Sequence, residues 1–139
     1  MEVVLPISCS DLGADTLIST LCLALAIYVE ARGEPIDGQL LVAEVILNRA
    51  AVDDYSGGVC GVIFAPHQFS GITPQLNIYT ILMDESWKTS MLVAQDALGG
   101  NTLGSGATHY HTTEVKPYWA DSLTKLGQYG DHIFYKENT

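Results

Sequence analysis

The chain has 139 residues, of which 47% are hydrophobic, which suits one compact domain and leaves no length for a second of ordinary size. Its 6 basic and 16 acidic residues give a net charge of −10. That charge disfavours nucleic acid and anionic lipid surfaces as partners, because like charges repel. No repeat or linker divides the sequence, so we expect a single domain over residues 1–139.

The first predicted element is a helix that starts near Asp15. Apolar residues recur at three- and four-residue steps from Leu17 to Tyr28, which predicts a core helix that is apolar nearly all round. This helix carries Glu30 at its C-terminal end. Its apolar stretch, 17–29, is too short to span a bilayer, so we expect neither a signal peptide nor a membrane anchor.

The elements that follow predict an α+β fold led by helices. A break at Gly33 and Pro35 and renewed helical spacing over 37–51 indicate a helical hairpin joined by the turn ARGEP. Residues 52–75 are expected to form loop with one strand-like piece, and a third helix is expected from about 85 to 98. In the tail, the runs ATHYHT and HIFYK predict two short strands in a small sheet or hairpin.

The three cysteines, Cys9, Cys22 and Cys60, form an odd and sparse set. Such a set is not a disulfide framework and lacks the paired spacing of a structural zinc site. We therefore expect reduced, mostly buried thiols, compatible with a reducing compartment.

Glu30 is the strongest candidate for chemistry. Cleavage of a glycosidic bond requires a carboxylic acid that keeps its proton near neutral pH, and both apolar burial and a helix C-terminus raise a carboxyl pKa. The residues alone leave open an ordinary role for Glu30, as a solvated side chain or as a partner of Arg32 or Arg49. Both arginines are expected to have structural roles.

The segment AIYVEARGEPIDGQLLVAEVILNRA resembles the core of the cell-wall hydrolases typified by the spore cortex-lytic enzymes SleB and CwlJ, which also occur in phage lysins. Later blocks follow in that family's order and extend the resemblance over about 23–136, namely VCGV, QFS, Trp87, ATHYH, PYWA and GDHIFY. The resemblance implies a lysozyme-like or lytic-transglycosylase-like fold. It also implies cleavage between N-acetylmuramic acid and N-acetylglucosamine, with Glu30 as the catalytic acid.

A wider set of side chains is predicted to contact glycan strands, the expected partner. Glu34 could line the cleft or merely order its own turn, and Phe69 could stack on a sugar or be buried in a plain turn. On a strand, His109 and His111 would share one face and Tyr110 the other. The predicted substrate-binding residues are Glu34, Gln68, Phe69, Ser70, His109, Tyr110, His111 and Tyr135.

Two competing functions remain open. His109, His111 and His132, with Glu30 or Glu34, could form the metal site of a peptidoglycan amidase or peptidase. The resembling family implies no metal, so we expect no cofactor. The other competitor is a non-catalytic wall-binding or virion protein, against which the intact EARGE run argues.

The sequence also predicts a reaction mechanism and a cellular setting. No second carboxylate stands out, although Glu34 or Glu44 could position a water, so a lytic transglycosylase is favoured over a hydrolase. Because no signal peptide or wall-binding repeat is visible, a phage or prophage endolysin is expected. It would stay in the cytoplasm of the producing cell until a holin releases it to the wall.

Overall fold

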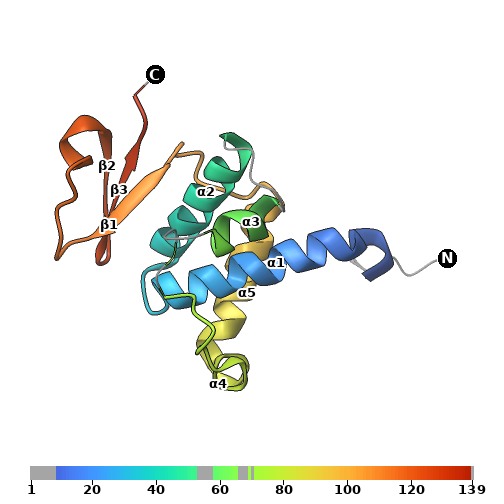
Figure 1. Cartoon of the computed structure of the whole chain (residues 1–139). Coiled ribbons are helices and arrows are strands. Elements are labelled where there is room, and N and C mark those ends of the chain that lie inside the picture. The colour runs from blue at the N-terminus through green and yellow to red at the C-terminus, as the bar shows by residue number, and fades with distance from the viewer. Residues whose placement is uncertain (1–8, 53–57, 66–68, 70, 139) are drawn as a thin grey trace.

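The computed structural model describes residues 9–52, 58–65, 69 and 71–138. A group of helices forms one part of this region, and a small sheet lies beside it (Figure 1). This is the α+β arrangement led by helices that the sequence predicts. In chain order the elements are α1 (Cys9–Ala31), α2 (Ile36–Val52), α3 (Gly58–Phe64), α4 (Ile78–Met83), α5 (Glu85–Leu98), β1 (His109–Thr112), the 3₁₀ turn η1 (Ala120–Ser122), β2 (Thr124–Tyr129) and β3 (His132–Lys136).

Helix α1 is the central element, and it packs against α2, α3 and α5. Its C-terminal half is buried, with Leu23 and Ile27 fully inaccessible to solvent. The expectation of a helix buried all round is wrong for its other half, because Leu17, Ile18 and Leu21 are exposed where fewer elements cover α1. None of the helices in the described ranges has the length and apolar content of a membrane span.

The hairpin of α1 and α2 forms as predicted. The Glu34 amide donates to the Ala31 carbonyl at 3.0 Å, and Gly33 adopts φ +83°, a left-handed conformation that glycine accepts without steric cost. The Gln39 side chain then donates to the Glu34 carbonyl at 2.9 Å. The turn is thus fixed by local hydrogen bonds, with Glu30 near the end of α1 and Glu34 in the turn itself.

Two expectations about residues 52–75 and the cysteines are corrected. The run VCGVIF forms helix α3 rather than a strand-like piece, because Val62 and Ile63 are buried against α1 and α2. Cys22 and Cys60 are joined in a disulfide, with Cα atoms 5.4 Å apart, and are not reduced thiols. Spacing along the chain could not reveal this pair, since the packing of α3 on α1 brings together residues 38 positions apart.

The sheet has three antiparallel strands in the order β1-β3-β2. The two predicted strands are its β1 and β3, whereas β2 lies in a segment expected only to separate them. Phe134, at the centre of β3, is fully buried and joins the sheet to the helical core. One face of the sheet therefore looks toward the helices and the other looks away from them.

Candidate active site

Glu30 lies in the last turn of α1, where the helix approaches the sheet. Its side chain is half-buried. Burial raises the pKa of its carboxyl above the ordinary value, because the charged form loses hydration. This is the environment that the apolar helix predicts for a proton donor.

Tyr110 is the side chain that contacts the carboxyl of Glu30 from the sheet. Its phenol O–H donates a hydrogen bond to the Glu30 carboxylate, which opposes the effect of burial and lowers the pKa of Glu30. Burial and the neighbouring Glu30 raise the pKa of Tyr110 well above 10, so its proton is retained. Tyr110 therefore acts as a fixed donor that orients the acid.

A turn that starts at Phe69 passes beside the same carboxyl. The Ile72 amide donates to the Phe69 carbonyl at 3.1 Å. A Cβ added to Gly71 would lie 2.4 Å from Val29 Cγ1 and 4.0 Å from Glu30 Oε2. Only glycine lets the backbone pass this close to Val29, beside the acid, and no pattern in the sequence indicates it.

The substrate-binding role predicted for the QFS run finds no support at Phe69. This ring is 6% exposed and belongs to the core cluster, so no face is free to stack on a sugar. Its position agrees with the alternative of a turn anchored by a buried aromatic ring. Gln68 and Ser70 lie outside the described residues.

Glu34 holds the β2–β3 hairpin turn against the α1–α2 turn. Both of its carboxylate oxygens accept from the Asp131 amide at 3.3 Å. Gly130, at φ +61°, makes this approach feasible, because a Cβ there would lie 2.2 Å from Glu34 Oε2. Glu34 thus orders a turn, as its alternative reading held, but the turn is the one in the sheet rather than its own.

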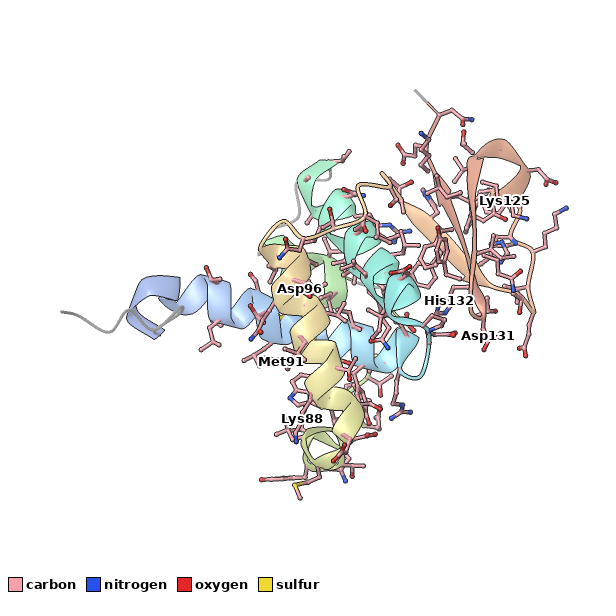
Figure 2. All side chains as sticks on the ribbon, turned by 180° about the vertical axis from the view of Figure 1, so that it is seen from behind. Lys88, Met91, Asp96, Lys125, Asp131 and His132 are labelled. Carbon is pink, nitrogen blue, oxygen red and sulfur yellow. A yellow bond between two sulfur atoms is a disulfide. The ribbon has the colours of Figure 1, made fainter. Side chains whose placement is uncertain are left out.

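His132 is the residue that this contact brings into the site. Figure 2 shows Asp131 and His132 at the end of the sheet nearest the α1–α2 turn. His132 Nδ1 lies 3.9 Å from Glu34 Oε1, and its ring meets the Tyr110 ring edge-on at 5.0 Å. Burial lowers the pKa of His132 below its ordinary value, and the Glu34 carboxylate opposes this shift without cancelling it. His132 therefore packs against Tyr110, which in turn contacts Glu30, and Glu34 lies beside His132.

The other predicted aromatic and histidine residues lie on the opposite face of the sheet. His109 and His111 point together, as strand alternation predicts, and both pack on Trp119. The Tyr135 hydroxyl is 2.9 Å from His111 Nε2, and its ring stacks on the same imidazole. The sheet therefore separates His109, His111 and Tyr135 from Glu30, and their contact with substrate stays a prediction.

The sheet also separates the three histidines that were considered as ligands of a metal site. His132 points toward the helices, whereas His109 and His111 point away, so the three imidazoles do not share a site. Within the described ranges, no group of three or more His, Cys, Asp or Glu side chains is arranged to hold a metal ion.

Glu44, considered as a second carboxylate beside Glu30, is held by hydrogen bonds to other residues. Glu44 is 4% exposed and accepts from the Leu103 amide at 2.8 Å and from the Ser105 amide and hydroxyl at 3.0 and 2.9 Å. These bonds fix Glu44 to the loop before β1, so it cannot position a water at Glu30.

Both arginines of the hairpin have structural contacts. Arg32 pairs with Asp84 at 3.5 Å and lies over the Tyr28 ring at 4.5 Å. Arg49 donates to the Thr108 carbonyl at 2.9 Å, which ties α2 to the segment that enters β1. These contacts agree with the structural roles expected for both residues.

The effect of the Tyr110–Glu30 hydrogen bond on the pKa of Glu30 can be tested without substrate. Tyr110→Phe should raise the pKa of Glu30, because the phenol that stabilises the carboxylate is removed while burial remains. Carbon-detected NMR titration of the Glu30 carboxyl measures this directly. Tyr118→Phe is the matched control, since Tyr118 is 95% exposed. An unchanged or lowered Glu30 pKa in Tyr110→Phe would show that the bond does not act on the acid.

A helical group joined to a small antiparallel sheet, with a half-buried glutamic acid at a helix end between them, defines the lysozyme-like class of domains. Residues 33–135 match the family model described as Cell Wall Hydrolase. The chain belongs to this family. The matched range begins three residues after Glu30, so it does not itself include that residue.

Individual relatives agree with this membership. A spore cortex-lytic enzyme of Halalkalibacterium halodurans is 39% identical over 113 residues, which cover 81% of this chain and 33% of that protein. The crystal structure of the catalytic domain of Bacillus cereus SleB aligns with TM-score 0.66 and 31% identity, over 85% of this chain and 89% of that one. The catalytic domain of the germination-specific lytic transglycosylase SleB from Bacillus anthracis aligns with TM-score 0.67 and 29% identity, over 89% and 96%. The chain thus spans about a third of the length of that Halalkalibacterium enzyme and nearly all of a SleB catalytic domain.

Proposed function

We propose that this chain degrades peptidoglycan by cleaving the bond between N-acetylmuramic acid and N-acetylglucosamine, as a lytic transglycosylase with Glu30 as its acid. The observation that carries the proposal is the setting of Glu30, half-buried, raised in pKa and oriented by Tyr110. Membership of the cell wall hydrolase family supports the substrate class. The likeness to a catalytic domain described as a lytic transglycosylase supports the reaction.

The reaction uses one carboxyl group twice. Glu30 donates its proton to the glycosidic oxygen as the bond from muramyl C1 to that oxygen breaks. The resulting carboxylate then takes the proton of the muramyl C6 hydroxyl, whose oxygen bonds to C1 and closes a 1,6-anhydro ring. Glu30 ends protonated and no water is consumed. A hydrolase would need a second carboxylate to act as nucleophile or to activate water, and Glu34 and Glu44 are both held by other partners.

Mass analysis of a peptidoglycan digest, before and after borohydride reduction, tests this proposal. We expect the muramyl ends to be anhydro sugars that do not change, because a reducing end gains two hydrogens and an anhydro end gains none. Activity should survive a chelator. Products that are mostly reducible at muramic acid would contradict the transglycosylase mechanism and make Glu34→Gln the next variant to test. Release of peptides, abolished by the chelator, would favour the metal-dependent amidase.

The setting of the reaction stays a prediction. A phage or prophage endolysin, held in the producing cell until a holin releases it, would meet its substrate outside the reducing cytoplasm. The Cys22–Cys60 disulfide is consistent with a protein that works there, since such bonds persist in oxidising surroundings.

A further inference from the structure

A second pocket lies on the face of the sheet that looks away from the helices. Its volume is about 460 Å³, and its floor is formed by β1, β2 and β3. The segment that leads from β1 to β2, including η1, forms its rim. Its lining includes His111, Lys116, Asp121, Lys125, Ile133 and Tyr135.

The sheet separates this pocket from Glu30. Along β1, Tyr110 points to the helices and bonds to Glu30, whereas the next residue, His111, lines the pocket. Along β3, Phe134 packs in the core, whereas its neighbours Ile133 and Tyr135 line the pocket. A ligand in the pocket would therefore contact the domain without occupying the cleft at Glu30.

The charge of the pocket is opposite to that of the protein. The whole chain carries −10, with only 6 basic residues, and two of these, Lys116 and Lys125, line this one pocket. Lys116 pairs with Asp121 at 3.3 Å. Lys125 has no carboxylate within ion-pair distance in the part of the chain that the structure describes. The lining thus offers two ammonium groups against one carboxylate, which favours an anionic ligand.

The wall behind these lysines is rigid and partly apolar. His111 Nδ1 lies 2.7 Å from the Thr112 carbonyl, which makes that nitrogen the donor and leaves Nε2 to accept from the Tyr135 hydroxyl. Both side chains are buried, so the pair holds one geometry. Ile133 adds apolar surface beside them. The matching ligand carries a carboxylate together with small apolar groups.

We propose that this pocket binds a carboxylate of the short peptide stems of peptidoglycan, as a second contact with the wall polymer. The inference rests on the proposed function, which supplies the polymer. Four extended residues reach about 14 Å, and the sheet has only three strands, with neighbouring strands about 4.8 Å apart. A stem can therefore pass round an edge strand to this face from a glycan strand bound on the other. Such a contact would hold the enzyme on a cross-linked wall between cleavage events.

NMR titration of the labelled full chain with a free stem tetrapeptide, Ala-γ-Glu-diaminopimelate-Ala, tests the pocket. We expect shifts at His111, Lys125 and Tyr135, and a Kd raised about tenfold in Lys125→Glu because a favourable charge becomes a repulsive one. Lys88→Glu is the matched control, since Lys88 lies on α5, away from the sheet (Figure 2). Its Kd should stay within twofold of wild type.

Several results would overturn the pocket. One is chemical shifts that map to residues outside the pocket. Another is an equal loss of tetrapeptide affinity in Lys125→Glu and Lys88→Glu. A third is no tetrapeptide binding by wild-type protein that cleaves glycan. Inorganic phosphate titrated in parallel separates a peptide site from a general anion site, and phosphate binding here as tightly as the tetrapeptide would refute the peptide class. Cleavage of stem-free glycan is measured on the same samples. If the tetrapeptide binds and no glycan is cleaved, the proposed function fails and the pocket stands.

Discussion

Reduction of the Cys22–Cys60 disulfide should lower the free energy of unfolding by about 4 kcal/mol, the loop-entropy value for a closed loop of this length. The bond closes a loop of 38 residues and ties α3, a helix of 7 residues, to the central helix α1. An open chain gains conformational freedom mainly in the unfolded state. The melting temperature should fall by roughly 10 to 20 °C for a domain of this size.

Calorimetry with and without a reductant measures this effect, and two variants control for it. Cys22→Ala combined with Cys60→Ala should melt near the reduced wild type and be insensitive to reductant. Cys9→Ala should behave as wild type, because Cys9 is outside the disulfide. A reduced wild type that melts within 2 °C of the oxidised protein would show that the bond contributes little.

The sequence predicted the helices best where periodicity was strong. Helix α5 has the predicted bounds, and α2 differs by one residue at each end. Helix α3 was missed because a short run rich in Val and Ile has strand-like propensity, which its packing on α1 and α2 overrides. Strand β2 was missed because Lys125, Gly127 and Gln128 interrupt any alternating pattern, so its pairing with β3 decides its conformation.

The site was predictable only in its centre. An apolar helix that ends in an acid makes Glu30 a candidate, and the resemblance to the cell-wall hydrolases singles it out. The opposed directions of Tyr110 and His111 follow from strand alternation. Which face of the strand meets Glu30 depends on how the sheet docks on the helices, and no local pattern reports that. Gly71 was missed for the same reason, because glycine is required there only by the close approach of Val29 from another part of the chain.

Glu30→Gln should abolish cleavage of peptidoglycan, with a loss of at least about 100-fold, the usual contribution of a positioned general acid. The amide is close to the carboxyl in shape and can still accept the hydrogen bond of Tyr110, so the site should keep its geometry. What is lost is the proton that the leaving oxygen requires.

The same substitution should leave the protein as stable as wild type, or more stable, at pH 7. Burial raises the pKa of Glu30 in the folded state above its unfolded value. A raised carboxyl pKa gives stability that is complete below the unfolded pKa, about 4.3, and is lost as pH rises through the folded pKa. At pH 7 the folded protein therefore bears the cost of a buried charge, and glutamine removes that cost.

The central claim is that Glu30 is the acid, and the most direct test is the rate of solubilisation of purified peptidoglycan by folded Glu30→Gln. Glu137→Gln, a change at an exposed carboxyl, is the matched control and should keep the wild-type rate. With melting temperature confirmed in the same samples, we expect Glu30→Gln to show less than about 1% of the wild-type rate. A folded Glu30→Gln that keeps more than about a tenth of that rate would contradict the assignment.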